Sequence, residues 1–256
     1  MGITDAVQGG GIEILNRTFD VLGAFCEGNA ERLSLSEIAR RAGLPKSTAH
    51  RILASMVCLG AVERSGQEYR LGMRMFEIGE HVPRKRDLRE AALPFMEDLY
   101  EVTHETVHLA VLDRTEVLYI ERIQGHHKQR QLASRVGGRL PAYCTGVGKA
   151  LLAFTPESAA AVITGGGLEA RTPYTITSPR VLLEELANIR RTRVSMDRDE
   201  NAIGIHCVAT PILVGGEAVA AMSVTGPGER ISEERVGSAV RTAGLGLQRV
   251  LSSAPC

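Results

Sequence analysis

The segment SLSEIARRAGLPKSTAHRILASM, residues 34–56, constrains the fold of this chain more than any other. Ser34 precedes Glu37 by three residues, a capping box that predicts the start of a helix. Gly43 is a favoured left-handed helix terminator, and Pro45 suits the first turn of a second helix because its missing N–H would have no partner there. Two short helices joined by so tight a link indicate a helix-turn-helix.

The flanking sequence adds a helix before this motif and a hairpin after it. Residues 12–27 place apolar side chains at helical spacing, and those expected on its apolar face are Leu15, Phe19, Leu22, Phe25 and Cys26. Residues 61–72 alternate apolar and polar around Ser65, Gly66 and Gln67, as a short β-hairpin does. Three helices and a hairpin predict a winged helix-turn-helix domain at residues 12–72, after a flexible leader at residues 1–11.

The charge pattern of this domain points to DNA. The chain carries 30 basic and 30 acidic side chains, so its net charge does not indicate a polyanion partner, but residues 38–62 contain basic groups and no carboxylate. A helix in the major groove needs polar or guanidinium groups for base edges and basic or hydroxyl groups for phosphates. The candidate contacts are Arg40, Lys46, Ser47, Thr48, His50, Arg51 and the wing residue Arg64. The alternatives are a merely solvated charged face, or a winged domain that contacts protein.

A single winged domain with few phosphate contacts should bind DNA weakly and with strong salt dependence. We therefore expect a homodimer, whose two-fold symmetry predicts a pseudo-palindromic operator.

The spacing of apolar residues changes in the second half of the chain. Residues 73–104 look helical on both sides of Pro83 and are interpreted as a connector helix. The strands expected after it are 106–113, 116–123, 130–136, 203–213 and 217–226. The helices expected are 146–154, 156–163, 179–193 and a last one that begins at Ser232. Residues 105–256 are thus predicted to form a mostly antiparallel α+β domain.

The pentapeptide HETVH, residues 104–108, matches the zinc-protease pattern H-E-x-x-H. That pattern places both histidines on one face of a helix. Here His108 lies in the alternating run TVHLAVL, while His104 stands where the preceding helix must end. In an extended segment the two residues are roughly 13 Å apart. We therefore interpret the stretch as a helix end followed by a strand, and we expect no metal site.

The segment LPAYCTGVGKALLAF resembles a nucleotide-binding loop only in part. Tyr143 stands where the phosphate loop needs glycine, and Ala150 stands where it needs serine or threonine. Thr145 and two glycines do open a helix, whose free N–H groups suit a carboxylate; a capped packing helix is the alternative.

Polar residues further along could line a small pocket with Cys144. They are Asp197, Glu200, Cys207, Ser223 and Thr225, and surface acids with satisfied sheet residues are the alternative. Cys207 beside His206 suggests a nucleophile and base, but neighbours on a strand point to opposite faces. A Cys/His hydrolase or a zinc enzyme is therefore only the second hypothesis.

Cysteine spacing and hydropathy limit the class of protein to which this chain can belong. The five cysteines are scattered with no CxxC pair, which argues against a disulfide framework and a zinc knuckle. No signal peptide and no run of about 18 apolar residues is present, so we expect a cytoplasmic protein with no membrane span and no cofactor.

Several segments in order resemble the isocitrate lyase regulator (IclR-type) family of bacterial transcription factors, from about Ile14 to Val250. They are LSLSEIARRAGLPKSTAHRILASMVCLGAVER, YRLG, HETVHLAVLD, RLPAYCTGVGKALLAF, DRDENAIGIHCVATPI and AAMSVTGPGERIS. His104 departs from the glycine that usually ends the family's helix, and Cys144 departs from another small or polar residue.

The resemblance implies a winged-helix DNA-binding domain, a connector helix and a GAF-like effector-binding domain, and it implies that the protein is not an enzyme. It also implies dimers, often paired into tetramers, that respond to a small organic or aromatic acid. By motif position the effector-binding residues would be Cys144, Thr145, Gly146, Val147, Asp197, Cys207, Ser223 and Thr225. The DNA contacts would be those deduced above.

Overall fold

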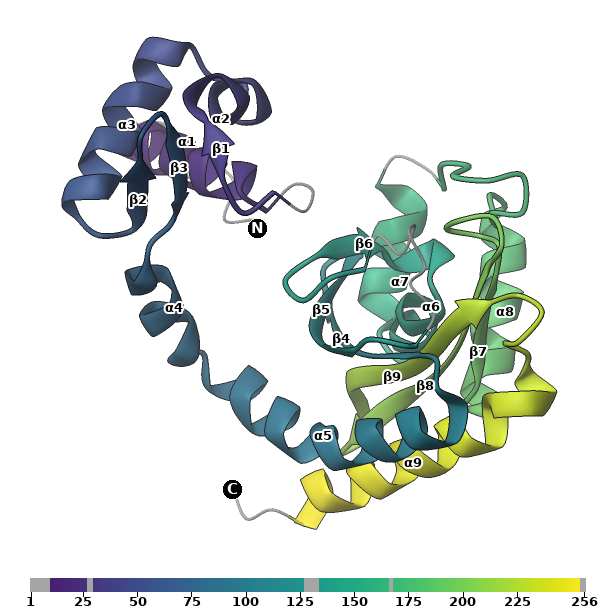
Figure 1. Ribbon diagram of the computed structural model, residues 1–256. Coiled ribbons are helices and arrows are strands. Elements are labelled where there is room, and N and C mark those ends of the chain that lie inside the picture. The colour runs from purple at the N-terminus through teal and green to yellow at the C-terminus, as the bar shows by residue number, and fades with distance from the viewer. Residues whose placement is uncertain (1–9, 27–29, 127–133, 166–167, 254–256) are drawn as a thin grey trace. The chain divides into compact units, whose positions relative to one another are not determined.

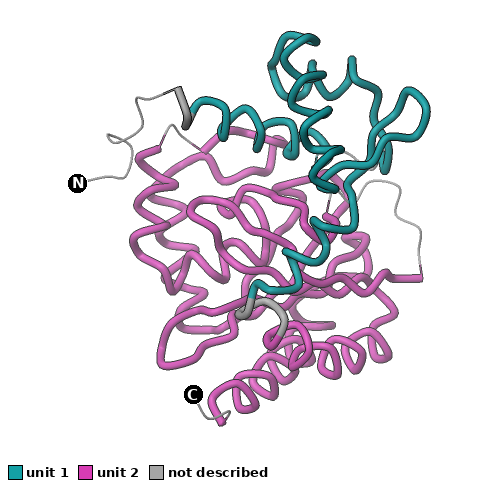
Figure 2. The backbone as a smooth tube through the Cα atoms, turned by 90° about the vertical axis from the view of Figure 1, so that its left-hand side faces the viewer, with its two compact units in different colours: residues 1–83 teal, residues 84–256 magenta. Residues whose placement is uncertain are grey.

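The computed structural model describes residues 10–26, 30–126, 134–165 and 168–253 (Figure 1). The chain divides into two compact units, Met1–Pro83 and Arg84–Cys256 (Figure 2). This boundary lies inside the segment 73–104 that the sequence suggested as a connector. Most of the expected leader lies outside the described residues, and the first helix begins at Gly10.

Unit 1 is a winged helix-turn-helix. Its elements are α1 (Gly10–Ala24), β1 (Leu33–Ser34), α2 (Leu35–Arg41), α3 (Lys46–Cys58), β2 (Val62–Ser65), β3 (Glu68–Leu71) and α4 (Met73–Glu80). The three strands form an antiparallel sheet in the order β1-β3-β2. The predicted capping box is present, because Glu37 N–H donates to Ser34 Oγ at 3.3 Å and Ser34 N–H donates to Glu37 Oε2 at 3.1 Å. Gly43 has the expected left-handed backbone, with φ 64°.

The core of unit 1 corrects one expectation about α1. Its buried side chains include Val21, Phe25, Ile38, Leu53 and Met56. Leu15 and Phe19, which were expected inside, are 57% and 70% exposed, and Cys26 is exposed as well. On α1, Val21 and Ala24 are buried and Leu22 packs against the same core, whereas Leu15 and Phe19 lie outside it. This leaves an uncovered apolar surface on α1.

Unit 2 contains a six-stranded antiparallel sheet. Its elements are α5 (Pro83–Thr103), β4 (Thr106–Asp113), β5 (Glu116–Ile123), β6 (Arg139–Pro141), the 3-10 turn η2 (Ala142–Cys144), α6 (Gly146–Leu152), α7 (Pro156–Thr164), α8 (Pro179–Thr192), β7 (Ser195–Arg198), β8 (Ile205–Val214), β9 (Glu217–Pro227) and α9 (Glu233–Ser253). The strand order is β6-β5-β4-β9-β8-β7.

Helices cover both faces of this sheet (Figure 1). On one face α5 and α9 pack against strand residues such as Val107, Leu109 and Val224. On the other face α6, α7 and α8 pack against residues such as Ala110 and Ala221. Successive strand residues alternate between the two faces. The arrangement confirms the predicted α+β class, and α5 is part of the packing of unit 2.

One strand prediction was wrong, and the edge strands β6 and β7 were not predicted. Ser134–Val136, the described part of the strand expected at 130–136, is not a strand; residues 130–133 lie outside the described residues. A left-handed turn at Gly137, with φ 75°, leads instead into the edge strand β6. Edge strand β7 was not expected, because its short sequence SMDR lacks an apolar alternation.

The interpretation of HETVH is confirmed. His104 N–H donates to Tyr100 O at 2.7 Å in the last turn before the strand, and His104 has φ 56°. His108 lies in β4, so the two histidines do not share a helical face.

Within the described residues, no helix has the length and apolarity to cross a membrane, and no group of three or more His, Cys, Asp or Glu could hold a metal.

Candidate functional site

The exposed face of α3 carries most of the predicted DNA contacts. Lys46, Ser47, His50 and Arg51 are exposed, and Thr48 is half-buried. The opposite face is buried through its apolar residues Ala49, Ile52, Leu53 and Met56. The helical spacing read from the sequence therefore gives one packed face and one polar face.

The arginines around α3 have different roles. Arg40 is exposed at the end of α2, whereas the Arg41 guanidinium donates to Ala24 O at 3.0 Å and ties α2 to α1. In the wing, Arg64 Nε donates to Gly66 O at 3.0 Å, and its guanidinium lies 5.8 Å from the centre of the Tyr69 ring. These contacts hold Arg64 in place on the hairpin without an ion pair among the described residues.

A second group of predicted residues meets on one face of the sheet in unit 2. Thr225 in β9 lies opposite Cys207 in β8, and Cys207 lies opposite Asp197 in β7. Cross-strand partners in an antiparallel pair share a face, and residues two apart on a strand do as well. Ser223 therefore joins the set. All four side chains are buried on the face covered by α6.

The start of α6 lies directly on this face. Thr145 caps the helix, because Gly148 N–H donates to Thr145 Oγ1 at 3.2 Å. A Cβ on Gly146 would come 2.8 Å from Cys207 Sγ, and one on Gly148 would come 2.2 Å from Ala142 O. Both glycines are thus needed for close packing. Cys144 and Val147 are buried beside them in the same core.

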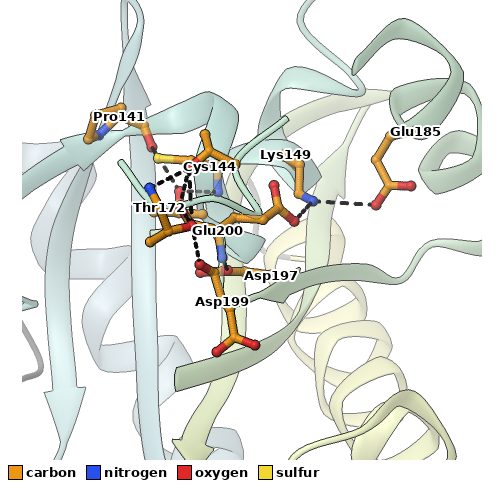
Figure 3. A network of polar contacts seen from close by, with 11 residues as sticks. Pro141, Cys144, Lys149, Thr172, Glu185, Asp197, Asp199 and Glu200 are labelled. Carbon is orange, nitrogen blue, oxygen red and sulfur yellow. Dashed lines mark hydrogen bonds and ion pairs between the residues drawn. The ribbon is translucent and has the colours of Figure 1, made fainter. Parts of the chain in front are cut away.

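A buried network of charges joins α6 to the loop after β7 (Figure 3). Lys149 Nζ pairs with Glu200 Oε1 and lies 3.4 Å from Glu185 Oε1 in α8. The Glu200 N–H donates to Asp197 Oδ1 at 2.8 Å, and Thr172 Oγ1 donates to Asp199 O at 2.6 Å. Asp197 and Glu200 are buried, so they are not the surface acids of the alternative hypothesis.

The thiols of this face are weak nucleophiles. Burial raises the pKa of Cys144 to about 12 and that of Cys207 to about 11. The thiolate is the reactive form, and little of it exists at neutral pH. His206 does not serve Cys207 as a base, because both of its ring nitrogens already contact other groups. Nε2 lies 3.2 Å from Asp199 Oδ2, and Nδ1 lies 3.3 Å from Ile231 O.

Sequence reasoning missed two residues of this face, His108 and Ser195. His108 Nε2 lies 2.7 Å from Ser134 Oγ, and Nδ1 lies 3.3 Å from Thr225 Oγ1. Burial lowers the pKa of His108 to about 3, so its ring is neutral. The alternation of TVHLAVL could have placed His108 on a strand face, but only the strand order shows that Ser223 lies opposite it.

Three buried polar atoms have no hydrogen-bond partner in the described part of the chain: Ser223 Oγ, Ser195 Oγ and Glu200 Oε2. An unsatisfied buried polar group costs about 1–3 kcal/mol. The two serines lie on the same face as Asp197. A ligand with polar groups at this face would supply the missing partners.

Comparisons with known proteins agree with the division of the chain into two units. A profile of the IclR helix-turn-helix domain matches residues 15–66, and one of the bacterial transcriptional regulator IclR C-terminal domain matches residues 80–247. The transcriptional repressor IclR of Escherichia coli (strain K12) is 35% identical over 240 residues, which cover 91% of this chain and 87% of the repressor.

Solved structures of similar proteins share the fold. An IclR homolog from Microbacterium hydrocarbonoxydans, complexed with 4-hydroxybenzoate, has a TM-score of 0.84 and 34% identity over 94% of this chain and 100% of that chain. The Thermotoga maritima IclR has a TM-score of 0.73 and 31% identity over 94% of this chain and 99% of that chain.

The winged domain and the helix-covered polar face of the sheet define a ligand-responsive transcription regulator. The chain belongs to the IclR family of bacterial transcription regulators. It carries the family's DNA-binding and effector-binding domains, as the resemblance implied. The relatives are regulators and repressors, so the hypothesis of a hydrolase or zinc enzyme has no support from them.

Proposed function

We propose that this regulator binds double-stranded operator DNA through α3, with support from α2 and the wing, and that a small organic acid binds in unit 2 and changes this affinity. The proposed DNA contacts are Arg40, Lys46, Ser47, Thr48, His50, Arg51 and Arg64. The proposed effector contacts are Cys144, Thr145, Gly146, Val147, Asp197, Cys207, Ser223 and Thr225. In this proposal residues 12–72 bind DNA, 73–104 connect and 105–256 bind the effector, in the cytoplasm where the operator lies.

The observation that carries the effector site is the buried, unpartnered hydroxyl of Ser223 on the face that also holds Asp197, Cys207 and Thr225. A buried hydroxyl favours a ligand that can hydrogen-bond to it. The bound 4-hydroxybenzoate of the Microbacterium homolog supports an aromatic or other organic acid as the class of effector. Such a molecule has polar ends for the hydroxyls and an apolar body for the buried core.

We also propose a homodimer, formed in part by unit 1. The support is the exposed apolar side chains on α1 (Leu15 and Phe19) and on α4 (Met73, Phe76 and Ile78), since residues three or four apart are neighbours on a helix surface. Contiguous exposed apolar patches on small domains mark contact surfaces. Two copies related by a two-fold axis would match a pseudo-palindromic operator.

The test is a mobility-shift titration of the full chain on the DNA upstream of its own gene, at two salt concentrations, with and without small carboxylic acids. We expect salt-dependent binding that is stronger than on unrelated DNA of equal length, and one or more acids that change the affinity about 5- to 150-fold. Equal affinity for both DNAs would contradict operator recognition and favour a protein partner for the winged domain. No acid response across a broad panel would contradict the effector class.

A further inference from the structure

Asp197 is a buried carboxyl group without a counter-charge of its own. Its side chain is 4% exposed, and the structure shows no ion pair for it in the described residues. The nearest buried cation, Lys149, is 1% exposed and already contacts Glu200 and Glu185. What Asp197 accepts instead are two backbone N–H groups, that of Glu200 at 2.8 Å and that of Asn201. A negative charge on Asp197 would therefore be in excess over the positive charge around it.

The groups that surround Asp197 come from several elements. The titratable and charged ones are Tyr119 in β5, Cys144 in η2, Lys149 in α6, Glu200 and Cys207 in β8. Two more charged groups act on members of this set: Arg171 on Cys144, and Glu185 on Glu200. Burial raises the pKa values of the two thiols and of the tyrosine, so these three groups are neutral at physiological pH. Arg171 is exposed, where solvent screens its charge. The balance at the centre of the cluster is one lysine against three carboxylates.

A carboxylate in such surroundings takes up a proton at a higher pH than an exposed carboxylate does, because desolvation and a like charge both disfavour the ion. Burial, followed by the charge of Glu200, raises the pKa of Asp197 to about 7. The unpartnered hydroxyls of Ser195 and Ser223 lie on the same face of the sheet. A protonated Asp197 adds a third O–H group to this face, and this group can donate to an anion.

We propose that Asp197 keeps its proton when the effector binds and donates it in a hydrogen bond to an anionic group of that effector, so that this site selects anions and its affinity depends on pH. The position of the effector rests on the proposed function, but the protonation of Asp197 in the free protein does not. No covalent bond changes in this step. Above about pH 7 the affinity for an anion falls with pH and approaches a tenfold loss per pH unit, because Asp197 must first take up a proton. A neutral hydroxylated ligand that donates to ionised Asp197 would show the opposite slope.

The first test needs no ligand. Because the pKa of Asp197 is raised in the folded state, the stability that its protonated form contributes is present at low pH and is lost as pH rises through about 7. Asp197→Asn has a neutral amide at every pH. We therefore expect its melting temperature, relative to that of the unmodified chain, to rise between about pH 4 and about pH 7 and to stay level above that. Asp113→Asn, at an exposed carboxylate paired with Arg139, is the matched control and should show no such trend.

A difference in melting temperature between Asp197→Asn and the unmodified chain that stays constant with pH would overturn the proposal. Infrared spectra of the unmodified chain give an independent measurement should Asp197→Asn fold poorly. They should contain a protonated-carboxyl band that disappears through about pH 7, and Glu200→Gln should move that midpoint to lower pH, because it removes a neighbouring negative charge. An unmoved midpoint, or no band, would contradict the assignment.

The second test uses 4-hydroxybenzoate as probe and 4-hydroxybenzamide as its neutral analogue, in calorimetric titrations of the full chain. The affinity for the benzoate should fall about fivefold from pH 7 to pH 8, while the affinity for the benzamide should not fall. Asp197→Asn should abolish the fall. Benzoate affinity that increases with pH would overturn the proposal. Failure of the proposed function would appear in the operator titration, whereas failure of this inference appears in the ligand-free melting profile.

Discussion

Gly146 at the start of α6 lies against Cys207 in β8, so closely that a Cβ on Gly146 would come 2.8 Å from the Cys207 sulfur. We predict that Gly146→Ala lifts α6 from the sheet. Overpacking of this kind costs about 1–3 kcal/mol, and the displaced helix should bind the effector more weakly. Denaturant unfolding and calorimetry with a bound acid would measure both effects.

The matched control for that variant is Gly79→Ala in α4, where an added Cβ meets no atom within 4 Å. It should leave both stability and acid binding nearly unchanged. Equal behaviour of the two variants would show that close contact at Gly146 is unimportant.

Ser223→Ala should separate binding from stability. Ser223 Oγ is buried without a partner, so its removal should cost little stability and should not weaken operator binding. Acid affinity should fall by about 1 kcal/mol, the usual worth of one hydrogen bond. Thr210→Val in β8 is the contrasting variant, because Thr210 Oγ1 donates to Arg193 O at 2.9 Å. It should lower stability and leave acid affinity intact; the reverse pattern would remove Ser223 from the site.

Arg51→Ala should weaken operator binding by about 1–3 kcal/mol, because Arg51 is exposed on the face of α3 proposed to enter the groove. Fluorescence anisotropy with labelled operator DNA would measure the loss. Arg180→Ala is the control, since Arg180 is exposed on α8 in unit 2 and pairs with Glu184. If both variants bind as the unmodified chain does, Arg51 is not part of the interface.

Phe19→Glu should shift the protein from dimer to monomer. Phe19 is 70% exposed on α1, and a charge there would have to be buried in the proposed contact between two copies. Sedimentation equilibrium would show the shift. Tyr174→Glu, at a side chain 62% exposed in unit 2, should leave the assembly unchanged. An unaltered molecular mass for Phe19→Glu would exclude α1 from the dimer contact.

The helix-turn-helix could be predicted because its signals are local. The capping box of Ser34 and Glu37, the left-handed Gly43 and the apolar spacing of α3 each act within a few residues. The outward turn of Leu15 and Phe19 could not be predicted in this way, since helical spacing shows an apolar stripe without showing what covers it.

The effector face could be predicted only in part. Alternation placed Ser223 and Thr225 on one side of a strand, but their juxtaposition with Asp197 depends on strand order and register, which are non-local. Lys149 was missed as a buried charge because lysines are nearly always exposed. Its burial depends on Glu200, 51 residues away in the chain.

The strands β4 and β9 separate the proposed effector face from α5 by the thickness of one backbone. His108 and Ser223 face α6, whereas the adjacent Val107, Leu109 and Val224 pack in the core that includes α5. Since α5 begins at Pro83, at the boundary of the two units, we expect a molecule that spreads or tightens these two strands to act on α5 through this shared core. The residues that recognise the signal could then be exchanged while the contacts of α5 are kept.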